Sequence, residues 1–479
     1  MIESPLLPRI AGYINGQWTD GKSRPITVTN PANAETLAEF PGMGENDTLD
    51  AVRAAEGALA QRASFEKRRE WLLKIDEVLR ANREEIGRIL TMEHGKPLAE
   101  AQGEVDYAAG FFRYCGEHID ELRPRTIDEH PKNCTWTVHQ RPAGVVALST
   151  PWNFPIGMIA KKLSSALAAD CASVIKPSSK TPLTMIALFT LLDRELDLPA
   201  GKVNLVMGSA GTISDTLLKH PSVRVFSFTG STEVGRELIE KAAPGIKRLT
   251  LELGGNAPFL VFDDADLDAA ADNLMGNKFR GGGQTCVCAN RVFVHERVAE
   301  AFAEKVAERV KGLRVGDGLA EGTTIGPLID ENAVDKVSRH VQDALNKGAK
   351  KVAELDVSGL PGTFYAPTVL LDVPAGALCT VEETFGPLVP MITFRDDDEV
   401  VAAANDTEYG LASYIFTGDR ERGHRVIERL NFAHAALNSG TGPTPEAPFG
   451  GMKQSGYGRE GGIEGLFEFV ETQTVPEAD

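Results

Sequence analysis

From residue 144 the sequence alternates short, continuously apolar runs with segments of helical period. Helices fit between these runs, for example over 184–196 and 231–241. Short runs without polar alternation are typical of strands buried inside a parallel sheet, and βαβ units place helices on the faces of such a sheet. The pattern predicts an α/β fold whose ligands collect at the carboxyl ends of the strands. The apolar runs are 145–148, 172–175, 203–207, 223–228 and 249–253.

A second alternation of helices and strands begins after Asp264. The length of 479 residues favours about two or three domains. We place the change of domain between Glu252 and Asp264. The second alternation predicts helices over 265–278, 297–311 and 331–347, and strands near 291–295, 389–394 and 412–417.

Charge and cysteine content exclude several classes of protein. The formal net charge of -18 argues against nucleic-acid and anionic-membrane partners, which bind clustered Lys and Arg. No stretch approaches the roughly 18 apolar residues of a membrane span, and the first ten residues do not resemble a signal peptide. Six cysteines are too few for a disulfide scaffold in a chain of this length. A cytoplasmic location is therefore expected, and no metal is predicted.

Three segments outside the alternation carry weaker signals. Residues 12–45 are rich in Gly, Pro, Asn and Thr, which predicts short strands or irregular structure, and no site is expected there. The helical period over 48–90 predicts packing helices. Residues 117–141 alternate apolar and polar side chains, which favours an exposed two-stranded arm of the kind that pairs with another subunit.

The stretch 281–291, GGGQTCVCANR, places Cys286 directly after residues without side-chain bulk. Consecutive glycines are kept where the backbone bends tightly or where something approaches it closely. Cys286 is therefore a candidate nucleophile. The alternative is a Gly-rich surface loop beside a buried cysteine that acts as a small apolar residue.

Polar residues follow the predicted strands at the edge where ligands are expected. Asn153 lies in a turn between two prolines and could donate to an oxyanion, or could cap its own turn. Lys176 and Ser179 could hold a ribose or a phosphate, or could be a solvated lysine and a helix cap. Gly230 precedes a helix whose first N–H groups favour a phosphate. Glu252 could be a general base with a pKa raised by burial, or a salt-bridged strand end.

Together these pieces resemble the aldehyde dehydrogenase superfamily over nearly the whole chain. The stretches QTCVCANR at 284–291 and KQSG at 453–456 are most similar to the succinate-semialdehyde dehydrogenases. The motifs that carry the wider resemblance are TPWNFP at 150–155, KPS at 176–178, FTGSTEVG at 228–235, LELGG at 251–255, GQTC at 283–286, EETFGP at 382–387 and PFGGMK at 448–453.

The resemblance implies a role for each part of the site. Cys286 attacks the aldehyde, Asn153 and the Cys286 backbone N–H hold the oxyanion, and Glu252 activates water to hydrolyse the thioester. Lys162 and Glu460 match a polar relay around the base. The cofactor positions are Trp152, Asn153, Lys176, Ser179, Gly230, Ser231, Gly235, Leu253, Glu383 and Phe385.

The semialdehyde enzymes bind the substrate carboxylate with two arginines and a serine. Arg280 and Ser455 match two of these positions, and Lys161 occupies the third, where it keeps the charge but loses the planar fork of an arginine. Gly281 and Gly282 replace bulkier residues and are expected to widen the pocket. Cys288 is either a redox partner of Cys286 or a small packing residue, and a disulfide across one residue would be strained.

The resemblance also implies the architecture. A Rossmann-type NAD(P)-binding domain is expected over 1–119 and 143–253, an α/β catalytic domain over 254–459, and a β oligomerisation arm over 120–142 with 460–479. The implied activity is NAD(P)-dependent oxidation of a small ω-carboxylate semialdehyde by a homodimer or homotetramer. Alternatives are the same chemistry on an uncharged or aromatic aldehyde, and a non-catalytic structural or binding protein. NADP is expected to serve at least as well as NAD, because Ser179 carries no charge that would repel a 2′-phosphate.

Overall fold

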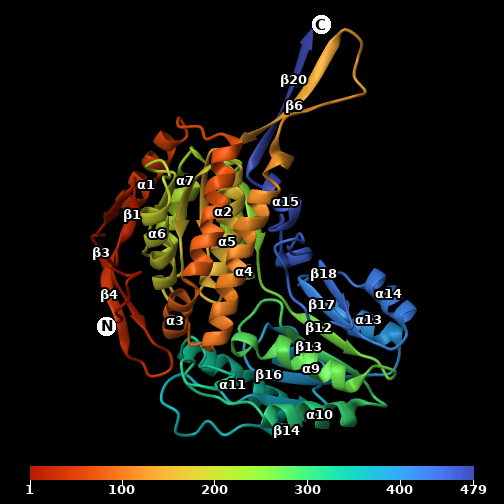
Figure 1. The fold of residues 1–479 in the computed structure, drawn as a ribbon. Helices are drawn as coiled ribbons and strands as arrows, with labels where there is room; N and C mark the ends of the chain where they lie inside the picture. The colour runs from red at the N-terminus through yellow and green to blue at the C-terminus, as the bar shows by residue number, and fades with distance from the viewer. Residues whose placement is uncertain (479) are drawn as a thin grey trace.

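The computed structural model describes residues 1–478 and contains two large β-sheets, each covered by helices (Figure 1). The predicted α/β class is confirmed. The first sheet has eight strands in the order β19-β11-β10-β7-β8-β9-β1-β2. Its strands are β1 (Gly12–Ile14), β2 (Gln17–Thr19), β7 (Val145–Ser149), β8 (Ala172–Lys176), β9 (Val203–Leu205), β10 (Val223–Thr229), β11 (Arg248–Glu252) and β19 (Gly456–Tyr457).

Strands β7 to β11 form the parallel centre of this sheet. β7 and β8 are buried along their whole length, which explains why the sequence shows runs without polar alternation. Helix α5 is also buried at every position, its polar residues Lys161, Lys162, Ser164 and Ser165 included, and the alternation did not predict it. The helices of this half are α1 (Glu45–Ala58), α2 (Phe65–Ala81), α3 (Arg83–His94), α4 (Leu98–Glu117), α5 (Pro155–Ala168), α6 (Leu183–Glu195), α7 (Ala210–Lys219) and α8 (Thr232–Ala242).

The second sheet has seven strands in the order β14-β15-β16-β13-β12-β17-β18, and all pairs except β14 with β15 are parallel. Its strands are β12 (Ala257–Val261), β13 (Ala289–His295), β14 (Lys350–Glu354), β15 (Thr368–Leu371), β16 (Leu388–Phe394), β17 (Ala412–Phe416) and β18 (His434–Leu437). Its helices are α9 (Leu267–Lys278), α10 (Ala299–Lys311), α11 (Glu331–Asn346), α12 (Leu378–Val381), α13 (Asp397–Asn405) and α14 (Arg420–Arg429).

The chain crosses between the sheets more than once. β11 ends the parallel run of the first sheet at Glu252, and β12 begins the second sheet at Ala257. β19 then returns to the first sheet, where Gly456 pairs with Glu252. The short helix α15 (Gly462–Phe467) follows and packs against α5. One strand inside the expected catalytic segment 254–459 therefore belongs to the first sheet.

Opposite edges of the two sheets face one another. Asn153 and Glu252 lie at the carboxyl edge of the first sheet, after β7 and at the end of β11. Cys286 and Glu383 lie at the amino edge of the second sheet, before β13 and β16. One cavity is lined by Asn153, Cys286 and Glu383, which places the two edges together. The cavity thus lies at the carboxyl edge of the first sheet, as the rule for parallel sheets predicts, and at the amino edge of the second.

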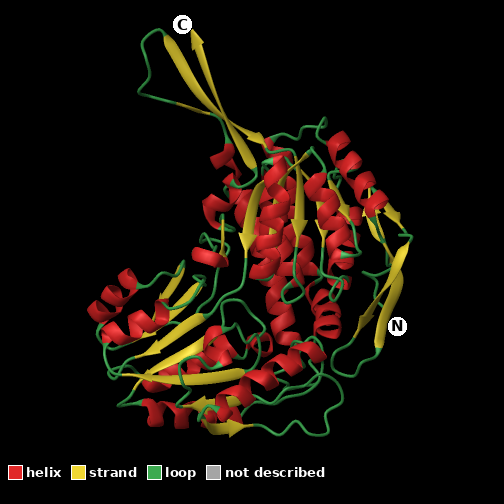
Figure 2. Cartoon of the chain, turned by 180° about the vertical axis from the view of Figure 1, so that it is seen from behind, coloured by secondary structure: helices red, strands yellow, loops and turns green. Residues whose placement is uncertain are grey.

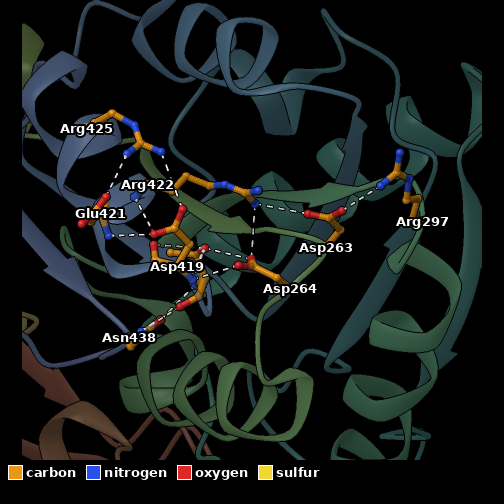
Figure 3. A network of polar contacts seen from close by, with 9 residues as sticks. Asp263, Asp264, Arg297, Asp419, Glu421, Arg422, Arg425 and Asn438 are labelled. Carbon is orange, nitrogen blue, oxygen red and sulfur yellow. Dashed lines mark hydrogen bonds and ion pairs between the residues drawn. The ribbon is translucent and has the colours of Figure 1, made fainter.

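The carboxyl edge of the second sheet is closed by a network of charged side chains (Figure 3). Asp264, after β12, accepts from the Asp419 backbone N–H at 2.8 Å, and Arg422 Nη1 lies 3.2 Å from Asp263 Oδ1. Burial opposes the charge of Asp263, but the hydrogen bond from Arg422 and the nearby positive charges together lower the pKa of that carboxyl. These contacts join the loops that follow β12 and β17, so this edge is part of the scaffold.

The arm is shorter than the alternation predicted. α4 continues to Glu117 and a 3-10 turn covers Ile119–Leu122, so only the later part of 117–141 is extended. Its strands are β5 (Arg125–Thr126) and β6 (Cys134–Pro142), and β6 pairs antiparallel with β20 (Val470–Ala478). Figures 1 and 2 show β6 and β20 projecting together from the body. β6 of the predicted arm thus pairs with the C-terminal strand of the same chain.

The N-terminal strands β3 (Ser23–Thr29) and β4 (Thr36–Gly42) form a separate antiparallel hairpin beside the first sheet (Figure 1). Within residues 1–478 no helix combines the length and apolar character that crossing a membrane requires. Over the same residues, no group of three or more His, Cys, Asp and Glu side chains could hold a metal ion.

Candidate active site

Three adjoining cavities lie along the facing edges of the sheets. Cavity A, of about 270 Å³, and cavity B, of about 360 Å³, share Cys286 and Met158 in their linings. Cavity C, of about 820 Å³, shares Lys180, Ile329 and Asp330 with cavity B. Cys286 therefore lies where cavity A meets cavity B.

The glycines before Cys286 are required by backbone conformation. Gly281, Gly282 and Gly283 have φ of +57°, +67° and +77°, a left-handed region that side chains rarely adopt. A Cβ on Gly283 would also lie 2.3 Å from the Gly386 carbonyl oxygen. None of the three lines cavity A, so the expectation that Gly281 and Gly282 widen the pocket stays a prediction.

The Cys286 thiol is protonated at neutral pH. Burial raises its pKa to about 12, although the nearby Lys161 ammonium acts in the opposite direction. Because the thiolate is the nucleophilic form, this site needs a base that removes the proton during attack.

Asn153 points its amide at the same loop. Its Nδ2 donates to the Gln284 carbonyl at 3.0 Å, two residues before Cys286. An amide nitrogen carries two N–H groups, so a second donor remains. The Oδ1 atom is buried and has no hydrogen-bond partner among residues 1–478.

Glu252 is the most perturbed carboxyl of the site. It is 3% exposed, and neither carboxyl oxygen finds a hydrogen-bond partner in the described part of the chain. Burial raises its pKa well above the ordinary value, the Glu460 carboxylate raises it further, and Lys161 and Lys162 oppose the rise. A carboxyl in this state can act as a base near neutral pH.

Glu460 and two lysines form a buried cluster beside Glu252. Lys162 Nζ donates to Glu460 Oε1, and also to Ser227 Oγ at 3.1 Å. Lys161 Nζ lies 3.9 Å from the other Glu460 oxygen. Burial opposes the charge of Lys161, but Tyr107 and Glu460 raise its pKa above the ordinary value.

The residues around cavity B fit a dinucleotide. Ser231 caps helix α8 by accepting from Val234 N–H, so the positive end of the helix dipole lies beside the cavity. Thr229 and Asn153 each contribute a buried oxygen without a partner in residues 1–478. Six of the predicted cofactor positions besides Asn153 line this cavity: Trp152, Gly230, Ser231, Leu253, Glu383 and Phe385.

Three other cofactor positions differ in placement. Ser179 lines cavity C, where its Oγ donates to the Gly208 carbonyl at 3.4 Å. Gly235 lines neither cavity: a Cβ there would lie 2.6 Å from the Leu253 side chain, so this glycine serves close packing of helix on strand. Lys176 is buried at the end of β8, and burial lowers its pKa to about 8.

Glu383 and Phe385 shape the wall opposite Asn153. Glu383 Oε1 accepts from the Gly255 N–H at 3.1 Å, and burial raises the Glu383 pKa to about 7. The Phe385 ring meets the Trp152 ring edge-on, with centroids 5.6 Å apart. These contacts join the two sheet edges across the cavity.

The N-terminal hairpin contributes to cavity C, although no site was expected in residues 12–45. Arg24 and Thr27 of β3 line this cavity together with Ser179 and Lys180. The Lys180 ammonium pairs with Asp330 on the rim shared with cavity B. No motif marks Arg24 in the sequence, because only the fold brings β3 to the end of β8.

Cavity A has a lining of apolar side chains, three basic ones and two acidic ones, and the charged residues are Lys96, Lys161, Arg280, Glu100 and Glu104. Lys161 is 2% exposed, whereas Arg280 is exposed and its Cζ lies 5.4 Å from the Phe154 ring centroid. Phe449 packs on Lys161, whose Nζ is 4.4 Å from the ring centroid. Arg280 has no ion-pair partner within 4 Å among the described residues, so its charge is available to a ligand.

Ser455 is not brought to this cavity. It is fully buried, its Oγ donates to the Gly254 carbonyl at 2.7 Å, and the same Oγ accepts from the Gly410 N–H at 2.9 Å. The hydroxyl therefore uses its hydrogen to donate to the turn after Glu252, and its oxygen already accepts a hydrogen bond. The geometry gives no support to its predicted role in substrate binding.

Cys288 has hydrogen-bonding partners of its own. Its Sγ donates to the Gly283 carbonyl at 3.3 Å and receives a contact from Lys278 Nζ at 3.6 Å. Cys286 and Cys288 are both free thiols. These contacts explain Cys288 as a packing residue, and its role as a redox partner stays a prediction.

Comparisons with known proteins agree with this site. The model of the aldehyde dehydrogenase family matches residues 18–475, so the chain belongs to the aldehyde dehydrogenase family. It is 48% identical to the succinate-semialdehyde dehydrogenase [NADP(+)] GabD of Escherichia coli, over 97% of this chain and 96% of the relative. It is 47% identical to the glutarate-semialdehyde dehydrogenase of Pseudomonas putida over the same shares.

A solved structure shares the whole fold. The oxidoreductase from Marinobacter aquaeolei is 62% identical, superposes with a TM-score of 0.97, and each chain covers 100% of the other. The predicted resemblance to the aldehyde dehydrogenases, and within them to succinate-semialdehyde dehydrogenases, is confirmed.

Proposed function

We propose that this protein oxidises a small ω-carboxylate semialdehyde, with succinate semialdehyde as the first candidate, to the dicarboxylic acid. One observation carries the proposal: Cys286 lies between a cavity whose lining includes the cations Lys161 and Arg280 and a cavity that fits a dinucleotide. The names of the relatives, succinate- and glutarate-semialdehyde dehydrogenase, support this substrate class.

Cys286 is the proposed nucleophile. As Sγ bonds to the aldehyde carbon, the thiol proton passes to a water molecule that acts as the base, since burial keeps the thiol protonated. The carbonyl oxygen becomes an oxyanion that the Asn153 amide and the Cys286 N–H stabilise. One donor of this kind contributes about 3 kcal/mol in comparable sites.

The second half of the reaction releases the acid. When bound, the nicotinamide accepts the hydride that the thiohemiacetal carbon loses, and a thioester remains on Cys286. Glu252 then takes a proton from the water that attacks the thioester carbon. The C–S bond breaks, which frees the carboxylic acid and regenerates the cysteine. Lys162 and Glu460 are the proposed relay that carries the Glu252 proton away, since they contact each other beside it.

The charge of cavity A distinguishes the candidate substrates. Lys161 and Arg280 favour a distal carboxylate, because a buried ammonium and a free guanidinium both gain from an anion. The rings of Phe154 and Phe449 favour the alternative of an uncharged or aromatic aldehyde. A purely structural or binding role is disfavoured by the joint placement of Cys286, Asn153 and Glu252.

NADP or NAD is the proposed cofactor, with NADP used at least as well. Ser179 supports this, because it is short and neutral and lines a cavity that also contains Arg24 and Lys180. The relative from Escherichia coli is named for NADP(+). A homodimer or homotetramer is also proposed, with the pair β6 and β20 as the contact surface. The six free cysteines support a reducing, cytoplasmic location.

A panel of aldehydes, each measured with both cofactors, tests the proposed function. Succinate and glutarate semialdehyde should give a kcat/KM at least about tenfold above neutral aldehydes of equal length, since a charged hydrogen bond is involved. Equal values for charged and neutral aldehydes would favour the uncharged substrate class instead. No oxidation of any aldehyde would favour a non-catalytic role.

A further inference from the structure

The turn that carries Asn153 is held by a buried ion pair that no sequence motif marked. Lys96 Nζ lies 2.6 Å from Glu104 Oε2 and donates to the Asn153 backbone carbonyl at 2.7 Å. Both charged side chains are only 1% exposed. Lys96 follows α3 and Glu104 lies on α4, so both reach the turn from other parts of the chain.

Glu104 fixes the far end of the same turn. Its Oε1 accepts the backbone N–H groups of Ile156 and Gly157, each at 3.1 Å. These N–H groups belong to the first turn of α5 and have no acceptor inside the helix. One carboxylate thus ties the start of α5 to Lys96, and Lys96 ties it to Asn153.

Lys96 also holds the residue between these points. Its Nζ lies 4.0 Å from the centroid of the Phe154 ring, which lines cavity A. Burying an ion pair costs desolvation energy, and apolar residues of the same volume often serve stability as well. Beyond the pair itself, these side-chain contacts all fall between Asn153 and Gly157, so the pair acts on the position of that turn.

We infer that the Lys96–Glu104 pair is a positioning device for the Asn153 amide. The inference rests on the proposed roles of Cys286 and Asn153. A donor that meets a developing oxyanion must be held closely, because a misplacement of about 1 Å can cost roughly a hundredfold in rate. The Asn153 side chain is fixed only if its backbone is fixed, and Lys96 is the group that holds its carbonyl.

The test is the rate of the first burst of reduced cofactor, which reports acylation. Lys96→Met should slow the burst roughly ten- to a hundredfold. Alkylation of Cys286 by iodoacetamide should keep its wild-type rate, because that reaction does not use the amide. Lys96→Met with Glu104→Gln should slow the burst equally and fold more readily, because it removes both charges and keeps an acceptor for Ile156 and Gly157.

Lys202 provides a matched control. It pairs with Asp170 at 2.5 Å, with side chains 1% and 0% exposed, and it lines none of the three cavities. Lys202→Met should lower the melting temperature as Lys96→Met does, but should leave the burst rate unchanged. A slowed burst in Lys202→Met would mean that loss of any buried pair slows acylation, and would overturn the inference.

A double-mutant cycle separates this inference from the proposed function. Asn153→Ala alone must slow acylation, and if it does not, the proposed oxyanion role is wrong. In the Asn153→Ala background, Lys96→Met should slow the burst by less than about threefold, because residues that act through one another are not additive. If the two substitutions slowed the burst by factors that multiply, or if Lys96→Met kept the wild-type burst rate, the positioning role of Lys96 would be wrong. The proposed role of Asn153 would still stand.

Discussion

The Cys286 carbonyl oxygen lies against Gly255 so closely that a Cβ on this glycine would stand 2.3 Å from it. The Gly255 N–H also donates to Glu383 at 3.1 Å. The loop after Glu252 is therefore in contact with the backbone of the nucleophile and with the wall of cavity B, and any side chain at Gly255 must displace Cys286.

We predict that Gly255→Ala lowers kcat/KM at least about tenfold, because the Cys286 backbone must move away from the added methyl group. Gly276→Ala is the control: it lies in α9, and nothing lies within 4 Å of its Cβ. That variant should keep full activity and gain about 0.5 to 1 kcal/mol of stability. Steady-state kinetics and thermal unfolding check both, and equal activity in the two variants would contradict the prediction.

Cys286→Ala should abolish aldehyde oxidation and leave cofactor binding intact, because it removes the nucleophile and no cofactor contact depends on its sulfur alone. Glu252→Gln should instead slow hydrolysis of the thioester. Rapid mixing should then show a burst of reduced cofactor in Glu252→Gln followed by little turnover. Full turnover by Cys286→Ala would exclude the proposed mechanism.

The pH dependence of hydrolysis should report Glu252. A carboxyl whose pKa is raised is charged only above that raised pKa, so the deacylation rate should fall as the pH drops through a value well above 4.5. Acylation should keep rising toward alkaline pH, because the pKa of Cys286 is about 12. Single-turnover rates measured from pH 5 to 10 check this. If the deacylation rate of Glu252→Gln still fell at low pH as in the wild type, the titrating group would be another residue.

Arg280→Ala should raise KM for succinate semialdehyde roughly ten- to a hundredfold, the loss expected for one charged hydrogen bond. A neutral aldehyde of equal length should be hardly affected, because its distal end makes no ion pair with Arg280. The comparison of KM for the two substrates in one variant separates loss of charge from a general disturbance of cavity A. Parallel losses on both would favour an uncharged substrate.

Ser179→Glu should shift the cofactor preference toward NAD, because a carboxylate in cavity C would repel a 2′-phosphate. The ratio of kcat/KM for NADP over NAD, in wild type and variant, is the measurement. We expect a ratio near or above one in the wild type and a fall of at least about tenfold in the variant. An unchanged ratio would leave the preference to Arg24 or Lys180.

The sequence was most informative where one physical rule decides the structure. The strands β7 and β8 were evident because burial on both faces removes polar alternation. The helix α5 was not predicted, and it buries Lys161 and Lys162 together with its apolar residues. The predicted arm began too early in the sequence, because the alternation of residues 117–141 does not show that α4 continues to Glu117.

Some residues of the candidate site could be predicted from the sequence and others could not. Asn153, Glu252 and Cys286 lie beside strand ends, so their neighbours in the sequence indicate where they meet. Lys96 and Arg24 could not be found from the sequence, because they reach the cavities through the packing of separate elements. Ser455 matched a motif, yet its hydroxyl serves the turn after Glu252, a use that only the hydrogen bonds reveal.

The pairing of β6 with β20 must form late in the folding of a newly made chain. Gln140 and Thr472 are hydrogen-bonded partners that lie 332 residues apart. β6 therefore has no β20 to pair with until most of the chain has been translated. Glu460, the partner of Lys162 beside the base, belongs to the same late-made segment. A nascent chain halted before this segment would expose the open edge of β6 and lack the relay. Truncated chains that lack β20 and Glu460 would therefore be inactive, and they would tend to associate through the unpaired edge of β6.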